Sequence, residues 1–313
     1  MIKYILKRML KSIPIFIGVI SISFLLVYIA PGDPAISMVG ENYKEETLQE
    51  IREELNLNKP IIKQYYLYIL KTIKLDFGKS YITGRKISKD LKQKLYFTFI
   101  LATTAMIFAI FFGIILGIIS ALNYQKLIDR IIVLFSIVGV SAPVFSVALL
   151  FIYIFGIKFK ILPPTGYGGI QFLILPALAL GLRSLSLFVR ITRDNFLDII
   201  QEDYMRTAKA KGLSFYKIIF KHGLKNLLIP IITIIGIDFS SYLTGAVLTE
   251  SIFGWPGIGR YLVDSIIKRD FPAIQASVLF MAFIFITINL LMDIFYSLVN
   301  PQIKENLIEE LSN

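Results

Sequence analysis

Long apolar stretches and shorter polar segments alternate along the whole chain. The apolar stretches cover about residues 12–30, 96–122, 131–157, 172–192, 226–250 and 274–299. A helix needs about 20 mainly apolar residues to cross the roughly 30 Å hydrocarbon layer of a membrane. Isolated strands are excluded because their backbone polar groups stay unsatisfied in lipid. The pattern therefore predicts an all-α membrane protein with six transmembrane helices.

The basic residues around these stretches predict the orientation. The N-terminus carries Lys3, Lys7, Arg8 and Lys11, and residues 190–225 hold eight Lys/Arg against four acids. Short basic segments stay on the cytoplasmic side, so we expect both segments, and with six spans also the C-terminus, in the cytoplasm. The fourth stretch contains a proline, a glycine and an arginine, but omitting it would put the basic segment on the opposite side.

Residues 31–95 then form an insertion outside the cell. They contain twelve Lys/Arg, but at about 65 residues the segment exceeds the length over which the charge rule applies. The prolines at positions 31 and 34 end the first helix, and helical spacing predicts two outer helices at residues 41–55 and 61–74. The expected organisation is an amphipathic lead and first span at 1–30, the insertion at 31–95, a core at 96–300 with a cytoplasmic loop at 193–225, and a tail at 301–313.

Composition agrees with a membrane protein and excludes several other classes. The chain is 56% hydrophobic, with a mean hydropathy of +0.70. Its net charge of +11 lies in loops beside spans and does not indicate nucleic-acid binding. With no cysteine there is no disulfide or thiolate metal site. The first apolar run is too long for a signal core and lacks a small-x-small cleavage site, so we expect it to remain as a span.

The most informative polar segment is residues 203–230, DYMRTAKAKGLSFYKIIFKHGLKNLLIP. It contains six Lys/Arg and a Gly-Leu-Ser sequence that ends one helix and begins another. The segment resembles the cytoplasmic "EAA" loop of ABC-importer permeases, in the form found in the peptide and nickel permease family. Arg206, Thr207 and Ala208 stand where the general motif has Glu-Ala-Ala, and Gly212 follows after three residues. Lys225 replaces the first proline of the general motif, whereas Pro230 matches a second proline position.

Further blocks of the chain resemble the same family in the same order. They are APGDPA at 30–35, LDFGKS at 75–80, ILPP at 161–164, LTESIFGWPGIGRY at 248–261, KRDFPAIQ at 268–275 and NLLMDIFYSLVNPQI at 289–303. The resemblance implies a type I ABC-importer permease fold in the cytoplasmic (inner) membrane. It also implies an ATP-driven importer of short peptides with no cofactor in this chain. Its expected partners are a second, related permease, two cytoplasmic ATPase subunits and an extracytoplasmic substrate-binding protein.

The resemblance also assigns a docking role to the basic loop, where a short helix would enter a groove on an ATPase subunit. We expect this contact to involve Tyr204, Arg206, Thr207, Ala208, Lys211, Gly212 and Leu213. Tyr204, Ala208 and Gly212 are spaced four apart and share one helical face that is nearly free of bulk beyond the tyrosine. Such a face can approach a partner backbone closely.

Charged residues inside the spans are candidates for the translocation path. Arg183, Asp238 and Asp293 each cost about 2.5–3.5 kcal/mol at a helix centre, so they should face protein or water. Asp293 lies near the inner end, where pairing within the bundle is the favoured role. Asp238 is the better path candidate because serines and a threonine lie beside it. The expected path residues are Ser141, Pro143, Asp238 and Thr244.

Glycine and proline mark two further positions. Gly254, Pro256, Gly257 and Gly259 predict a tight re-entrant turn after the fifth span. The resemblance allows a second role there, a periplasmic gate or docking surface formed by Trp255, Pro256, Gly257 and Gly259. On the second span, Gly113 and Gly117 form a G-x-x-x-G pattern, which favours close helix packing within the subunit over packing against a partner permease.

Several alternatives remain open at this point. Nickel or a nickel chelate is a second possible substrate, because GYGG at 166–169 and WPGIGRY at 255–261 also resemble nickel permeases. An intramembrane enzyme on lipid-linked substrates would need a cluster of catalytic acids or histidines, and the only histidine, His222, lies among lysines. Lys79 and Ser80 mimic the end of a P-loop, which has the pattern G-x-x-x-x-G-K-[ST]. Position 73, where the first glycine of that pattern would stand, is isoleucine, so ATP hydrolysis is expected on partner chains. A channel or secondary transporter would have no use for the docking loop.

Overall fold

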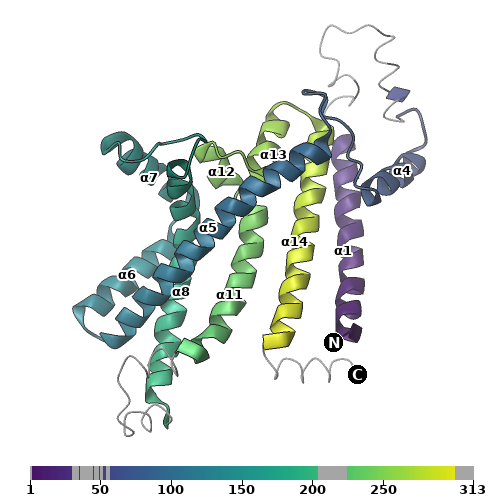
Figure 1. Cartoon of the computed structure of the whole chain (residues 1–313). Coiled ribbons are helices and arrows are strands. Elements are labelled where there is room, and N and C mark those ends of the chain that lie inside the picture. The colour runs from purple at the N-terminus through teal and green to yellow at the C-terminus, as the bar shows by residue number, and fades with distance from the viewer. Residues whose placement is uncertain are drawn as a thin grey trace. The chain divides into compact units, whose positions relative to one another are not determined.

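The structure, a computed structural model, describes residues 2–29, 35, 45, 49, 52–53, 57–203 and 224–299 (Figure 1). The described part is helical, as the apolar pattern predicts. It divides into two compact units. The first comprises residues 1–98 and 256–290, and the second comprises residues 99–255 and 291–313.

Each predicted span corresponds to a helix. The bounds are α1 (Ile2–Ile29), α5 (Ile87–Leu122), α6 (Leu127–Ser141), α7 (Val144–Phe151) with the π-helix η1 (Ile152–Lys158), α8 (Gln171–Gln201), α11 (Leu224–Gly245) and α14 (Phe271–Val299). Among described residues, α5, α8 and α14 are long and apolar enough to cross a membrane, and the bent pair of α6 with α7–η1 makes a fourth. Shorter apolar segments lie in α1 (Met9–Leu25) and α11 (Ile234–Leu243).

Three of the predicted spans differ in detail from the helices. The stretch expected to span at 131–157 is not one continuous helix, because the chain bends by 110° between α6 and α7–η1. Pro143 stands at the bend with extended backbone, and it lacks the N–H that would continue α6. The fifth helix ends at Gly245, so residues 247–250 belong to a separate helix, α12 (Val247–Phe253). The N-terminal lead and the first span form one helix, α1.

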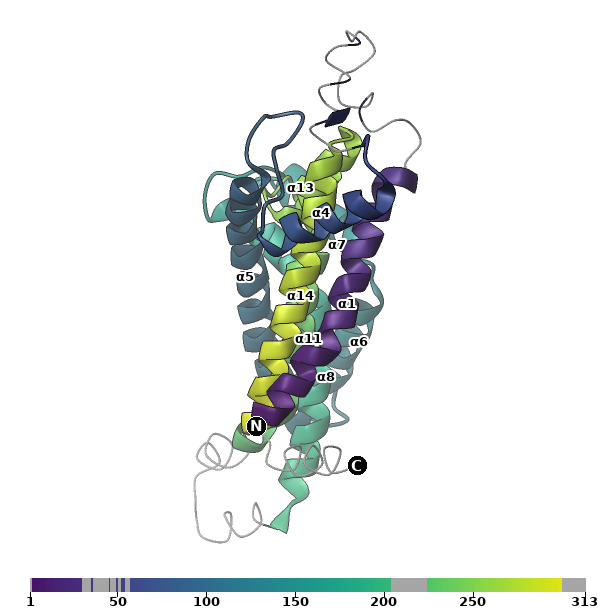
Figure 2. The ribbon, with the colours of Figure 1, turned by 90° about the vertical axis from the view of Figure 1, so that its right-hand side faces the viewer.

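In the first unit, α1 and α14 run side by side (Figure 2). The Phe16 and Phe283 rings meet edge to face at 6.2 Å, and Gln275 Nε2 donates a hydrogen bond to the Ser23 carbonyl at 2.9 Å. Helix α4 (Ile61–Ile73) confirms the helix expected at 61–74. The other helix, expected at 41–55, falls largely outside the described residues.

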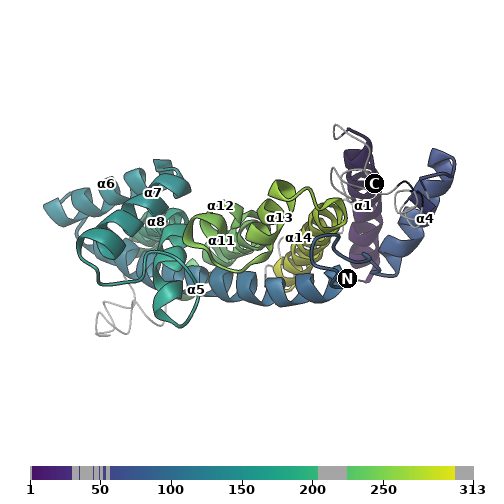
Figure 3. The ribbon, with the colours of Figure 1, turned by 90° about the horizontal axis from the view of Figure 1, so that it is seen from above.

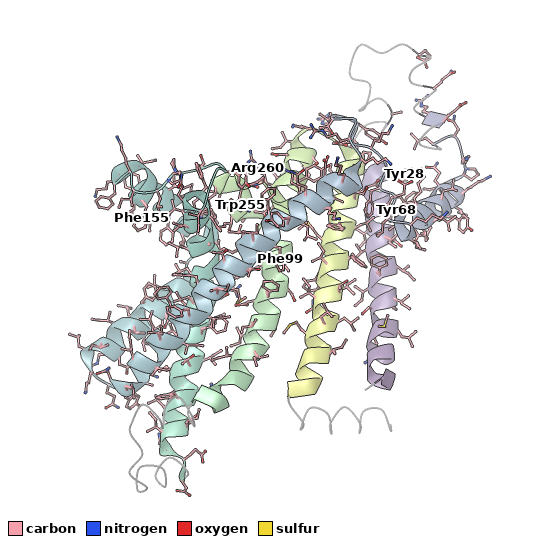
Figure 4. All side chains as sticks on the ribbon, viewed as in Figure 1. Tyr28, Tyr68, Phe99, Phe155, Trp255 and Arg260 are labelled. Atoms are coloured by element: carbon pink, nitrogen blue, oxygen red, sulfur yellow. The ribbon has the colours of Figure 1, made fainter. Side chains whose placement is uncertain are left out.

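An aromatic cluster fastens α4 to α1. Phe24 of α1 contacts the rings of Tyr65 and Tyr68 at 5.3 and 5.6 Å, and the Tyr68 hydroxyl shares a 3.0 Å hydrogen bond with Ser23. Tyr28 and Tyr68 mark this cluster in Figure 4. Burial raises the pKa of Tyr68 to about 12, so its phenol stays neutral at physiological pH. The outer helix is therefore attached to the first span by apolar and neutral contacts.

In the second unit, α8 is the central helix. It packs against α6, α7, α11 and α12 (Figure 3). Of the most apolar 18-residue stretch of α8, 61% is buried, against 39% for the corresponding stretch of α5. The core beside it consists of Val147, Ala148, Leu175, Ala179 and Phe253.

Glycines allow α5 and α6 to approach α8 closely. A Cβ added at Gly113 would lie 2.5 Å from Phe188 Cβ, and one at Gly117 would lie 2.6 Å from Thr192 Cβ. In the reverse direction, a Cβ at Gly181 of α8 would lie 2.7 Å from the Ala105 carbonyl oxygen of α5. The G-x-x-x-G pattern thus packs within the subunit, which confirms the favoured interpretation.

A buried ion pair connects α8 to the turn between α5 and α6. Arg193 donates to both carboxylate oxygens of Asp129, from Nε at 2.7 Å and from Nη2 at 3.0 Å. Ser120 Oγ and the Gln125 backbone N–H complete the carboxylate's hydrogen bonds at 2.5 and 2.9 Å. Asp129 is only 3% exposed. Gln125 has a positive φ of 63°, so Asp129 also holds a turn that a non-glycine residue rarely adopts.

Filling the close approach of α5 to α8 should destabilise the protein. Gly117→Val puts a side chain against both the Thr192 side chain and the Val189 carbonyl oxygen, and such overpacking costs about 1–3 kcal/mol. Gly18→Val is the matched control, because a Cβ at Gly18 meets nothing within 4 Å and both changes alter helix propensity equally. We expect a lower thermal midpoint in detergent for Gly117→Val alone; equal midpoints would contradict the packing.

Removing the charge of Asp129 should be more costly. Asp129→Asn leaves the Arg193 guanidinium, whose side chain is 18% exposed, without its buried counter-ion, at an expected cost of about 3–5 kcal/mol. The control is Asp194→Asn, because Asp194 contacts the same arginine at 3.1 Å but has a side chain that is 54% exposed. Exposed pairs contribute about 0–1 kcal/mol. Similar thermal midpoints for the two variants would show that the Asp129 pair is not a structural brace.

Candidate translocation site

The expected ATPase-docking residues lie outside the part of the chain that the structure describes. These are Tyr204, Arg206, Thr207, Ala208, Lys211, Gly212 and Leu213, and His222 falls in the same segment. The described chain reaches Asp203 just after α8 and resumes at Leu224 with α11. The helix that leads into this segment is the one braced by Asp129 and Arg193.

A cavity of about 280 Å³ lies within the second unit. Helices α7, α8, α11 and α12 all contribute to its wall. The lining residues are Val144, Phe145, Leu180, Arg183, Ser184, Asp238, Ser241, Tyr242, Leu248 and Thr249. On α11 the lining positions 238, 241 and 242 are three and four residues apart, which places them on one face of the helix. The cavity thus combines an apolar wall with polar groups from three helices, α8, α11 and α12.

A chain of hydrogen bonds fixes the carboxylate in this cavity. The Tyr242 hydroxyl donates to Ser184 Oγ, and the Ser184 hydroxyl donates to Asp238 Oδ2. Tyr242 and Ser184 are buried, with exposures of 7% and 2%. Buried polar groups of this kind hold a defined orientation because every change of rotamer breaks a hydrogen bond. Asp238 itself is half-buried and faces the open space.

Arg183 lines the same cavity and is exposed. It forms no ion pair or hydrogen bond with any other residue that the structure describes, Asp238 included. Arg183 and Asp238, two charged residues within spans, therefore do not pair with each other. The side chain of Asp293 is not among the described ones.

The other expected path residues are placed differently. Ser141 and Pro143 are exposed at the bend between α6 and α7, next to the cavity-lining Val144. The side chain of Thr244 is not among the described ones. Reasoning from sequence missed Ser184 and Tyr242 because neither is charged. The four-residue spacing of Tyr242 from Asp238 was the available signal.

The glycine-rich turn begins where α12 ends. Gly254 has a φ of 67°, a left-handed conformation that favours glycine, and it ends α12. Trp255 is buried and meets the Tyr167 ring edge to face at 5.5 Å (Figure 4). The Gly166 N–H donates to the Phe253 carbonyl at 2.7 Å. The GYGG segment and the end of α12 are therefore held together.

The remaining gate candidates begin the next helix, α13 (Ile258–Ile267). Gly257 precedes it with extended backbone, after Pro256. Gly259 is buried inside α13, so its assignment to the turn is wrong. The Ile258 N–H donates to Thr98 Oγ1 at 2.9 Å, which anchors the start of α13 on α5.

The first unit contains a polar cluster after α13. Ser80 Oγ donates to Asp270 Oδ2 at 2.5 Å, and the Tyr81 N–H donates to Oδ1 at 3.3 Å. These bonds join the LDFGKS and KRDFPAIQ segments. Burial raises the pKa of Tyr261, and the Asp90 and Asp270 carboxylates raise it further, so this phenol remains neutral. Among the described residues there is no group of three potential metal ligands.

Comparison with known proteins identifies the family. Residues 113–305 match the family described as binding-protein-dependent transport system inner membrane component, and residues 1–102 match the N-terminal family of the same membrane component. The glutathione transport system permease protein GsiC of Salmonella typhimurium (strain LT2) is 39% identical over 304 residues, which cover 97% of this chain and 99% of the relative. GsiC of Escherichia coli (strain K12) is 38% identical over the same shares.

Family membership accounts for the helical fold and for the transport role, and it removes the intramembrane enzyme from consideration. It also implies a binding protein and an ATPase as parts of the same transport system. Since the two family matches cover nearly the whole chain, the chain belongs to the inner membrane components of binding-protein-dependent transport systems, and is a permease subunit of an ABC importer.

Proposed function

We propose that this permease carries short peptides inward across the cytoplasmic membrane. The observation that carries the proposal is the end-to-end similarity to glutathione permeases, over 97% of this chain and 99% of the relative. Glutathione is a tripeptide, so a peptide-type substrate follows from that similarity. Nickel is not favoured, because the relatives reported above are named for glutathione.

The cavity of the second unit supports a polar substrate. Its wall includes a carboxylate, a guanidinium and four hydroxyl-bearing side chains beside apolar residues. Small-molecule sites commonly combine an apolar wall with a few such polar groups. We place the translocation path along Asp238, with Ser141 and Pro143 at the nearby bend and Thr244 one turn and a half further along α11.

We propose an assembly in which a second, related permease pairs with this chain, two cytoplasmic ATPase subunits drive the pair and an extracytoplasmic binding protein delivers the substrate. Within residues 193–225, the part of the chain that follows α8 forms the coupling loop, and Tyr204, Arg206, Thr207, Ala208, Lys211, Gly212 and Leu213 contact the ATPase. The brace between Asp129 and Arg193 supports this role, because a rigid α8 transmits the position of the loop to the cavity that α8 lines.

The same proposal fixes the orientation and the domains. Both termini are cytoplasmic, residues 31–95 lie outside, residues 96–300 form the permease core and residues 301–313 form a cytoplasmic tail. Trp255, Pro256, Gly257 and Gly259 then belong to the periplasmic side, as part of a gate or docking surface. Burial of Trp255 and the hydrogen bond between the end of α12 and the GYGG segment support a defined structure there.

The orientation can be tested with single cysteines, because the chain has none. Lys59→Cys, at an exposed position before α4, should react with a membrane-impermeant maleimide added to whole cells. Ser214→Cys in the basic loop should react only after the cells are permeabilised. The opposite pattern would reverse the topology and remove the docking role of the loop.

Coupling can be tested with Gly212→Asp in reconstituted complexes. The aspartate would strain a glycine that we expect to end a helix, and it would introduce a charge into the proposed contact, where a buried unpaired charge costs several kcal/mol. We expect normal insertion but loss of binding-protein-stimulated ATP hydrolysis and of ATP-driven glutathione uptake. Uptake of nickel instead of glutathione by the unmodified complex would contradict the peptide assignment.

The control for this variant is Gly169→Asp. Gly169 has no atom closer than 3.9 Å to an added Cβ, and the proposed orientation puts it outside the cell. It should couple and transport like the unmodified permease. Wild-type stimulation in Gly212→Asp would contradict the docking assignment.

A further inference from the structure

The cavity of the second unit holds two opposite charges that do not neutralise each other. Arg183 and Asp238 both line it, yet no ion pair joins them among the interactions of the described residues. Oppositely charged side chains in a shared small space normally pair, because desolvation of an isolated charge is costly. Each of these two therefore keeps its charge available to something else in the cavity.

The carboxylate is held in place for this purpose. The Tyr242 hydroxyl donates to Ser184, and Ser184 donates to one oxygen of Asp238, Oδ2. The other oxygen, Oδ1, accepts no hydrogen bond from a described residue. A carboxylate oxygen accepts from a cationic donor in a strong, charge-assisted hydrogen bond. Asp238 thus presents a fixed acceptor for an ammonium group.

Arg183 supplies the opposite chemistry on the neighbouring helix. Its guanidinium presents donors in a planar fork that suits a carboxylate. Arg183 precedes Ser184 directly in α8, so the residue that orients Asp238 is attached to the residue that would bind the anion. Val144, Phe145, Leu180 and Leu248 provide the apolar remainder of the wall.

From these contacts we infer that the cavity is a binding station for a zwitterion, in which Asp238 receives the free α-ammonium group of a short peptide and Arg183 receives its free α-carboxylate. This inference deepens the proposed function and rests on it for the identification of the ligand as a peptide. The cavity volume of about 280 Å³ lies near the lower end of the range of small-molecule sites, about 300–1,000 Å³. A ligand of that size brings both of its termini into the same cavity, as a dipeptide does.

The test measures protection of a cysteine in the cavity, in the assembled importer complex. Ser241 lines the cavity and is exposed, and the chain has no other thiol, so maleimide labelling of Ser241→Cys reports occupancy. The probes are dialanine, N-acetyl-dialanine and dialanine amide. Dialanine should slow the labelling, and each capped peptide should need about tenfold more for the same protection, because a hydrogen bond to a charged group is lost. Asn58→Cys, exposed outside the cavity, should label at one rate throughout.

Charge-removing variants then assign each terminus to its partner. With Asp238→Asn added, dialanine and N-acetyl-dialanine should protect equally, while the amide remains about tenfold weaker than dialanine. With Arg183→Gln added, the pattern should reverse: dialanine and dialanine amide should protect equally, while N-acetyl-dialanine remains weaker than dialanine. A purely structural role of either residue would weaken all three probes alike and would overturn the inference.

If the Asp238→Asn or Arg183→Gln variant fails to assemble, the inference is still tested by Ser241→Cys alone, through the comparison of free and capped peptides. Equal protection by all three probes, or none by any, would overturn it. The proposed function has a separate readout, since ATP-driven glutathione uptake by the unmodified complex is measured independently. If uptake is intact but the three probes protect equally, only the inferred zwitterion site is contradicted. If uptake is absent, the proposed peptide import itself is contradicted.

Discussion

Close packing of α8 against its neighbours is the constraint on which the second unit depends. Gly113 and Gly117 of α5 leave room for Phe188 and Thr192, and Gly139 of α6 leaves room for Ser186. In a bilayer, burial of apolar side chains drives helices together only weakly, because lipid is as apolar as leucine. Small residues compensate by letting backbones approach closely. This packing sets the position of Ser184, and through it the orientation of Asp238.

Polar interactions complete what the glycines allow. The carboxylate of Asp129 binds Arg193, Ser120 and the Gln125 backbone. Each of its two oxygens therefore accepts two hydrogen bonds. A second carboxylate, Asp270, receives bonds from Ser80 and Tyr81 in the first unit. In both carboxylates each oxygen accepts at least one hydrogen bond from the protein, and these bonds hold segments together. Asp238 differs because one of its oxygens faces a cavity, which distinguishes a group available to a ligand from a structural one.

The arrangement relates the cavity to the proposed coupling loop through one helix. Arg183 and Ser184 lie in the middle of α8, and Arg193 lies nearly three turns further along it, before the chain enters residues 204–223. A continuous helix moves as one body, since bending it breaks backbone hydrogen bonds. Displacement of the loop by an ATPase would therefore also act on the wall of the cavity. This connection gives the proposed coupling a physical route within a single chain.

The sequence by itself determined the helical membrane class, because a run of about 20 apolar residues has no other stable form in lipid. It also determined the helix at 61–74 and the family, since the motifs are local and keep their order. Only the tertiary structure decided that α6 and α7 bend by 110° at Pro143, that Gly259 lies inside a helix and that Asp129 pairs with Arg193. Likewise, Ser184 and Tyr242 acquired their roles only through the contact of α8 with α11. Residues 54 to 64 positions apart meet in these contacts, and such pairing depends on how helices pack, which local periodicity does not specify.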